Sequence, residues 1–172
     1  MPVIAVIDAG YYRIPLPVPL SDSTHGNMLA FELNTVRLRD ADGAEGTGYT
    51  FTCGRNGAAI DAILRRDVPE QLIGQDADRI EHLWQRIWWG QHYGGRGGPA
   101  VLAQSALDMA LWDLKARRLD EPLWRLLGGF DPRLSPTNRP PRNLSRASRR
   151  SSTSPSGRPS STPAFPSPTH RQ

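Results

Sequence analysis

The composition of the chain changes abruptly near residue 134, and this break limits what the chain can fold into. Residues 135–172 contain ten Ser, eight Pro and seven Arg, but no Lys, Asp or Glu. A segment with so few apolar residues cannot bury enough surface to offset the entropy of ordering, and its prolines preclude a helix or a central strand. We therefore predict one folded domain over residues 1–134 and a disordered tail over residues 135–172.

The break also divides the charge. Residues 1–134 carry 14 Lys and Arg against 17 Asp and Glu, a net charge of −3, whereas the tail carries +7. The formal net charge of +4 for the whole chain therefore describes neither part. Seven arginines could contact phosphates. However, the tail has one aromatic residue and no folded platform, which argues against nucleic acid as a partner.

Cysteine usage and hydropathy indicate the compartment. No apolar run is long enough to cross a membrane, and the first residues lack the basic region of a signal peptide. Cys53 is the one cysteine, which excludes an internal disulfide and a multi-cysteine metal cluster. The four histidines are not spaced as metal ligands, so we predict no metal site in this chain. We expect a cytoplasmic protein.

The first 52 residues have the patterns of β-strands. Strands are predicted over 3–14, 28–39 and 44–52, with Asp42-Gly43 as the hairpin turn between the last two. The polar run 21–27 is predicted to be a loop. In the second strand, four residues share one face: Leu29, Phe31, Leu33 and Thr35.

Two glycines of the third strand, Gly46 and Gly48, share a face and indicate that a helix or another backbone packs closely there. After Gly54 the apolar period becomes helical. Asp76 is predicted to cap an amphipathic helix, and Pro99 to begin a long buried helix over about 99–118. Strands followed by helices predict an α+β fold, a three-stranded antiparallel meander followed by a helical bundle.

Spacing alone reveals no catalytic constellation, and we name no catalytic residue. Asp113 in the long helix is interpreted as the partner of Arg117 in an i, i+4 ion pair. The glycine-rich run at 94–98 is not a P-loop, because no Lys-Ser/Thr follows it. Close packing before a buried helix is the interpretation that we adopt for this run.

Residues 98–129, GPAVLAQSALDMALWDLKARRLDEPLWRLLGG, closely resemble the end of the N-terminal capping domain of the mandelate racemase/muconate lactonizing enzyme group in the enolase superfamily. The hairpin Asp42–Gly48 also fits, and the resemblance covers about residues 2–134. The segment Tyr93–Val101 resembles most the sugar-acid dehydratases of the galactarate/talarate kind.

This resemblance implies a division of labour. Members of the group join such a cap to a (β/α)₇β barrel, whose Lys or His base abstracts the proton α to a carboxylate and whose acids hold Mg²⁺. The cap supplies two loops that close over the substrate, and these map onto about 16–27 and 51–55. Their polar or aromatic residues are the candidate specificity residues, with His25 and Arg55 preferred: Ser21, Asp22, His25, Tyr49, Cys53 and Arg55.

The chain departs from the group after Leu134, where the barrel would begin. No barrel, base or metal ligands follow, so we expect this chain alone to bind no Mg²⁺ in the family manner and to be inactive. One hypothesis is a truncated or frameshifted dehydratase, because Arg/Pro/Ser-rich sequence is what GC-rich coding DNA yields out of frame. Another is a racemase, epimerase or cycloisomerase subunit complemented by a separate barrel chain.

A third hypothesis, from another class, is a non-enzymatic binding protein that uses the basic tail. Whichever holds, a sugar-acid substrate is expected as a partner only if a barrel is supplied. Because the cap of the group packs on its barrel, an isolated cap would expose an apolar face. We therefore predict homo-oligomers or aggregation.

Overall fold

The computed structural model describes residues 1–129. The predicted boundary near 134 and the disorder predicted for residues 135–172 lie outside these residues. The described part has an antiparallel sheet of three strands, β1 (Ile4–Asp22), β2 (Gly26–Asp40) and β3 (Glu45–Thr52), in the order β1-β2-β3. The α+β class and the three-stranded meander are thus confirmed.

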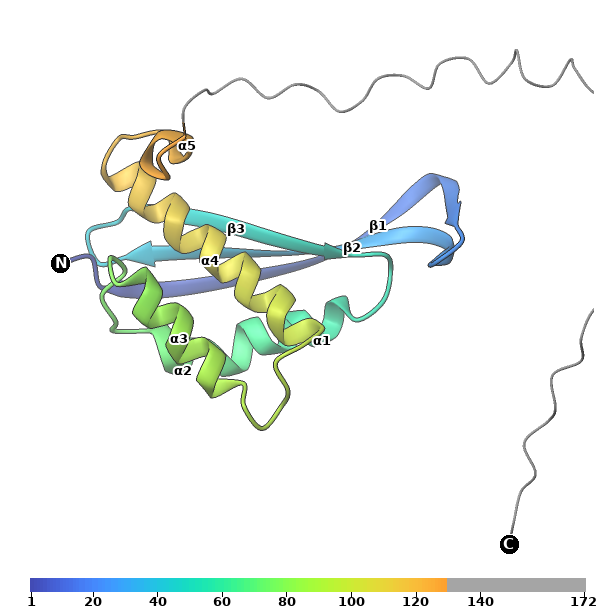
Figure 1. Ribbon diagram of the computed structural model, residues 1–172, viewed down its shortest axis with the longest axis horizontal. Helices are drawn as coiled ribbons and strands as arrows, with labels where there is room; N and C mark the ends of the chain where they lie inside the picture. The colour runs from blue at the N-terminus through green and yellow to red at the C-terminus, as the bar shows by residue number, and fades with distance from the viewer. Residues whose placement is uncertain (130–172) are drawn as a thin grey trace, which may run out of the picture. The chain divides into compact units, whose positions relative to one another are not determined.

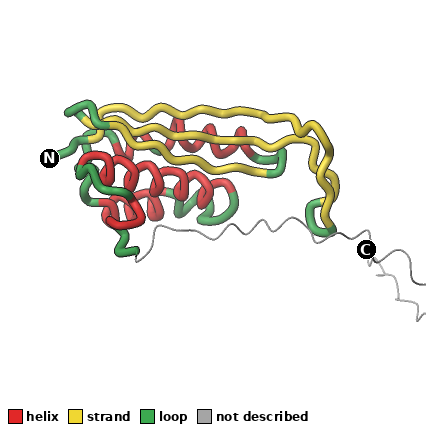
Figure 2. The backbone as a smooth tube through the Cα atoms, turned by 90° about the horizontal axis from the view of Figure 1, so that it is seen from above, coloured by secondary structure: helices red, strands yellow, loops and turns green. Residues whose placement is uncertain are grey.

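The helices follow the strands in the chain and lie on one face of the sheet (Figures 1 and 2). They are α1 (Gly57–Ala62), the π-helical turn η1 (Ile63–Asp67), α2 (Pro69–Leu72), α3 (Ile80–Gly90), α4 (Pro99–Arg118) and α5 (Leu123–Leu126). The long helix has the bounds that the sequence predicted. Figure 2 shows the strands as one layer and the helices as the other.

The core lies between these two layers. Val36 and Leu38 of β2 are fully buried against the apolar face of α4, which presents Leu107, Leu111 and Leu114. Gly46 and Gly48 of β3 face the same helix, and a Cβ at Gly48 would overlap the carbonyl oxygen of Ala106. The prediction that these glycines mark a close approach is confirmed.

The four β2 residues predicted to share a face do so, but that face points away from the helices. Leu29 on this outer face is 63% exposed, whereas the alternate residues of the same strand are buried. Those buried residues include two polar ones, Glu32 and Asn34. This part of the outer face is therefore apolar, and its most exposed side chain is that of Leu29.

The prediction of a loop over residues 21–27 is wrong. Ser21 pairs with Asn27 and Asp22 with Gly26, so only residues 23–25 form the turn. Asp22 makes this tight connection possible, because its Oδ1 accepts the backbone N–H groups of Thr24 and His25 at 2.8 and 2.6 Å. The hairpin extends further than its polar composition indicates.

The prediction that Asp76 caps a helix is also wrong, since α3 begins four residues later at Ile80. Asp76 lies in a short bridge to the start of β1, opposite Val3. The flanking backbone is held there as well: Gly74 N–H donates to the carbonyl of Ile4 at 2.9 Å. These bonds keep the segment extended and delay the helix.

Candidate functional site

The far end of the β1–β2 hairpin bends toward the side of the sheet on which the helices lie (Figure 2). Pairing is regular from Val6 opposite Arg39 to Pro15 opposite Ala30, and it resumes at Leu20 opposite Met28. Four residues of β1 thus face a single residue of β2, and such a bulge bends a strand. The prolines in this stretch favour the interruption, because they cannot donate to the ladder.

A cleft of about 400 Å³ lies where the bent hairpin meets the segment between β3 and α1. The tip of the hairpin contributes two of the lining residues, and the end of β3 with the following loop contributes four. Its lining residues are Thr24, His25, Phe51, Thr52, Cys53, Arg55 and Leu102. Two segments that are far apart in sequence therefore meet at one opening.

The His25 ring is oriented by a carboxylate of its own turn. Its Nδ1 lies 2.8 Å from Oδ2 of Asp22, which favours the tautomer with the proton on Nδ1 and leaves Nε2 available to a ligand. Hydrogen bonds from the backbone and then the side chain of His25 hold the pKa of Asp22 below its ordinary value. Asp22 thus stays charged near neutral pH and fixes the ring.

The other wall of the cleft belongs to a loop with two left-handed residues, Gly54 (φ 80°) and Asn56 (φ 69°). Gly54 lies against the backbone of β2, where a Cβ would come within 2.9 Å of the carbonyl oxygen of Ala30. This loop carries Cys53, which is half-buried, and Arg55, which is exposed. The cationic head of Arg55 is thus free to meet a ligand.

Beneath that loop lies Glu32, whose side chain is almost fully buried. Burial alone would raise the pKa of Glu32. Hydrogen bonds from the Tyr11 hydroxyl, the Gly57 backbone and the Thr52 hydroxyl outweigh that effect, helped by the charge of Arg13, and the pKa lies below its ordinary value. The carboxylate is therefore ionised at neutral pH.

The six predicted specificity residues divide into three groups. His25, Cys53 and Arg55 line the cleft, and Asp22 supports it through His25. Ser21 pairs within the hairpin and Tyr49 lies on the outer face of β3, so neither lines the cleft. Whether any of these residues contacts a substrate remains a prediction.

Four lining residues were not singled out from the sequence. Thr24, Phe51 and Thr52 belong to the predicted loop ranges or adjoin the named residues, so their position was the available signal. Leu102 lies in α4, and nothing in its helical pattern distinguishes it from a core residue. It joins the cleft because the first turn of α4 lies beside the loop after β3.

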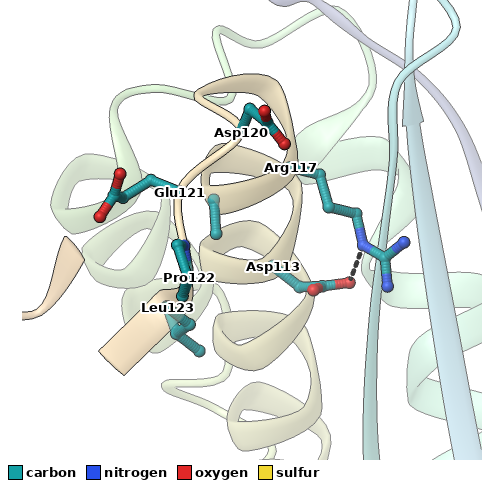
Figure 3. Close-up of a pocket in the computed structure, with 7 residues that line it drawn as sticks. Asp113, Arg117, Asp120, Glu121, Pro122 and Leu123 are labelled. Atoms are coloured by element: carbon teal, nitrogen blue, oxygen red, sulfur yellow. Dashed lines mark hydrogen bonds and ion pairs between the residues drawn. The ribbon is translucent and has the colours of Figure 1, made fainter. Parts of the chain in front are cut away.

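A second hollow of about 350 Å³ lies where α4 turns into α5 (Figure 3). Its acidic residue Asp113 already has two hydrogen-bond donors: it accepts the backbone N–H of Thr47 and the Nε–H of Arg117, each at 2.8 Å. The predicted Asp113–Arg117 ion pair is confirmed. Figure 3 shows the Glu121 carboxylate directed away from that pair, so the acids here do not converge on one ligand.

Among the residues that line the cleft, only His25 and Cys53 are of the kinds that commonly ligate metal ions. Across residues 1–129, no group of three or more His, Cys, Asp or Glu side chains is arranged around a common point. In the same residues, no helix has the length and apolar character needed to cross a membrane. The chemistry that the cleft can supply is hydrogen bonding and positive charge, from His25, Arg55 and two threonine hydroxyls.

Residues 9–128 match the model of the N-terminal domain of mandelate racemase and muconate lactonizing enzyme. The chain belongs to this family. It is 56% identical over 121 residues to 3,6-anhydro-alpha-L-galactonate cycloisomerase from Streptomyces coelicolor, covering 70% of this chain and 34% of that protein. It is 32% identical over 120 residues to L-talarate/galactarate dehydratase from Salmonella typhimurium, covering 67% and 30%.

Solved structures of the family agree with this fold. A racemase from Streptomyces coelicolor with bound magnesium superimposes with a TM-score of 0.74 at 53% identity, over 76% of this chain and 36% of that one. The chain spans about a third of the length of the relatives that it matches. The matched third is the N-terminal capping domain of Mg-dependent dehydratases and cycloisomerases.

Proposed function

We propose that residues 1–129 form the substrate-capping domain of an acid-sugar enzyme, and that its cleft contacts the substrate through His25 and Arg55. The observation that carries this proposal is the meeting of the hairpin tip and the β3–α1 loop at one 400 Å³ opening. These are the two segments that the family resemblance assigns to substrate closure.

The chemistry of the cleft suits a carboxylate that also bears hydroxyl groups. Arg55 offers a planar fork of donors that matches a carboxylate, and the threonine hydroxyls can donate to or accept from a sugar. No acid is among the lining residues, and the nearby carboxylate of Asp22 is engaged by the His25 ring. Phe51 and Leu102 supply an apolar wall that would help to exclude water from a closed site.

The proposed role does not include the chemical step. In this family the base and the Mg²⁺ ligands belong to the barrel, and Mg²⁺ when bound stabilises the negative charge that develops on the substrate carboxylate. Within residues 1–129, no three or more His, Cys, Asp or Glu side chains are grouped as metal ligands would be. We expect the chain alone, assayed with Mg²⁺ against sugar acids, to show no turnover, and we propose that it acts in the cytoplasm with a barrel.

Between the two substrate classes, we favour a 3,6-anhydrogalactonate-like acid over a galactarate-like one. The capping domain is 56% identical to that of the cycloisomerase and 32% identical to that of the talarate/galactarate dehydratase. Because the cap contributes to specificity, the higher identity supports a similar substrate. A dehydratase activity is the second candidate and is separated by the same experiment.

The experiment is a domain exchange. The matching 121 residues of the Streptomyces coelicolor cycloisomerase would be replaced by those of this chain, and the chimera assayed with Mg²⁺ on 3,6-anhydrogalactonate, talarate and galactarate. We expect turnover of the first acid. Turnover of talarate or galactarate alone would favour the dehydratase class. A folded chimera that turns over none of them would overturn the proposed function.

A further inference from the structure

Two buried polar side chains of β2 hold the loop that forms one wall of the cleft. Glu32 is 5% exposed and Asn34 is fully buried, because both lie on the face of the sheet that packs against the helices. Both are nevertheless polar. Burying a carboxylate and an amide is costly unless each is hydrogen-bonded. The hydrogen bonds of Glu32 and Asn34 therefore indicate what these two residues do.

The Glu32 carboxylate joins the two ends of the loop. Its Oε2 accepts the Thr52 hydroxyl at 3.1 Å, at the end of β3, and the Gly57 backbone N–H at 2.8 Å, at the start of α1. That N–H is one of the first amides of a helix, which have no partner within the helix. One oxygen atom thus holds both Thr52 and Gly57, the residues on either side of the loop 53–56.

Asn34 completes the attachment. Its Nδ2 donates to the carbonyl oxygen of Gly57 at 3.1 Å, so both backbone polar groups of Gly57 are bonded to β2 side chains. Only a glycine allows this approach, because a Cβ at position 57 would lie 2.7 Å from the Cβ of Glu32. The loop is held by specific polar contacts rather than by apolar packing.

The other carboxylate oxygen of Glu32 faces away from the loop. Its Oε1 accepts the Tyr11 hydroxyl at 2.8 Å and lies 3.3 Å from the Arg13 guanidinium, both on β1. This division provides matched variants, because one contact can be removed on the loop side and another on the β1 side of the same carboxylate.

We infer that Glu32 is a positioning residue, which holds the Thr52–Gly57 segment so that Arg55 and Cys53 face the cleft. This inference rests on the proposed function for its catalytic meaning, while the positioning itself is a property of the chain. Loss of the carboxylate would free the loop without removing any side chain that lines the opening.

Cys53 provides the test, because it is the one cysteine of the chain and lies inside the held segment. The rate of Cys53 alkylation would be measured on the full 172-residue chain, with increasing low concentrations of urea, alongside the equilibrium unfolding curve. Modification through local opening depends weakly on urea, whereas modification through global unfolding follows the full equilibrium slope.

Glu32→Gln is expected to raise the alkylation rate at least about tenfold with a weak urea dependence, and Thr52→Val about two- to tenfold, as expected for one hydrogen bond. Tyr11→Phe, which removes a contact on the β1 side, is expected to change the rate less than Thr52→Val. If Glu32→Gln does not fold, Thr52→Val and Tyr11→Phe still decide the comparison.

The inference is overturned if the faster alkylation follows global unfolding, or if Tyr11→Phe accelerates it as much as Thr52→Val. Its link to function is measured separately in the chimera, where Glu32→Gln, which leaves every lining side chain in place, is expected to raise KM more than it lowers kcat. If the loop is loosened and KM does not change, the inference that Glu32 positions the loop still holds, but the proposal that the cleft contacts the substrate is contradicted.

Discussion

Gly48 of β3 lies so close to Ala106 of α4 that any Cβ at position 48 would overlap the carbonyl oxygen of Ala106. Two backbones are in direct contact there, and neither can withdraw without opening the core between the sheet and the longest helix. The contact explains why the strand carries a glycine at a position where a glycine otherwise weakens a strand.

Replacing Gly48 by alanine is expected to destabilise the fold by about 3 kcal/mol or more, or to prevent folding, because overpacking against backbone cannot be relieved by a rotamer change. Urea unfolding followed by circular dichroism measures the change. Gly97→Ala is the control, since a Cβ there meets no atom within 4 Å, and the close packing predicted for the run 94–98 is wrong at this position. Equal destabilisation by the two variants would contradict the packing that Gly48 makes with α4.

Asp40 joins the hairpin turn to the end of α4. Its side chain is fully buried, accepts the backbone N–H groups of Asp42 and Ala44 at 3.0 and 2.9 Å, and bonds to Arg118. Asp40→Ala would leave these donors without an acceptor, so we expect a loss of about 2–4 kcal/mol in the free energy of unfolding. Asp42→Ala, at a position whose side chain is 63% exposed, is expected to cost much less.

The pKa of Glu32 lies below its ordinary value of 4.5, because hydrogen bonds to the ionised carboxylate outweigh burial. The folded chain therefore binds this proton less readily than the unfolded chain, and the stability that Glu32 contributes is present in full above pH 4.5. It is lost as the pH falls through the lower pKa of the folded state.

Glu32→Gln is accordingly expected to lower the urea midpoint at neutral pH and to approach the wild-type midpoint in acid. Asp22, whose pKa is also lowered, remains in both proteins and contributes with the same sign, so the comparison isolates Glu32. A difference between the two proteins that does not narrow below pH 4.5 would show that the contribution of Glu32 does not depend on its charge.

Arg55 and Asp22 separate direct contact from support in the chimera. Arg55→Ala is expected to raise KM about tenfold or more, since a charged hydrogen bond to a carboxylate is lost. Asp22→Asn, which only weakens the hold on the His25 ring, is expected to raise KM about two- to tenfold. Ser21→Ala is the matched control, because Ser21 belongs to the same hairpin end but does not line the cleft. A KM raised equally by all three would point to a general loosening of the tip.

Much of this fold follows from local signals in the sequence. The Asp42-Gly43 turn, the glycine pair of β3 and Pro99 at the start of α4 each depend on a few neighbouring residues, and each was predicted. Asp76 does not cap a helix as predicted, because its environment is set by a bridge to Val3, more than seventy positions away. The segment 21–27 pairs as strand at both ends instead of forming the predicted loop, because one Asx turn at Asp22 closes the hairpin.

The candidate site could be predicted in part for the same reason. His25, Cys53 and Arg55 were selected as polar residues in two loop ranges, and the cleft unites them. The hydrogen bonds that hold the loop 53–56 could not be predicted, since in sequence Glu32 and Asn34 are indistinguishable from exposed polar residues of an alternating strand. The role of Glu32 and Asn34 depends on which face of the sheet the helices cover. The apolar character of Phe31 and Leu33 wrongly indicates that the opposite face, on which these two residues lie, is the covered one.

That outer face leads to the last prediction, which concerns association. Ile14 of β1 and Tyr49 of β3 are 45% and 52% exposed on this face. On the same face, the Phe31 and Phe51 rings pack edge-on, with their centroids 5.9 Å apart. A contiguous apolar patch of this kind is typical of a surface that contacts another protein. We expect the chain to associate at micromolar concentration, as measured by light scattering coupled to size exclusion.

The double variant Ile14→Thr/Tyr49→Thr is expected to reduce that association, because threonine retains the strand preference while removing apolar area. Tyr93→Thr is the matched control, since Tyr93 is fully exposed and lies outside the sheet. If the two variants associate to the same extent as the unchanged chain, the outer face is not the contact surface. If the unchanged chain is monomeric, the patch is too small to hold two copies together.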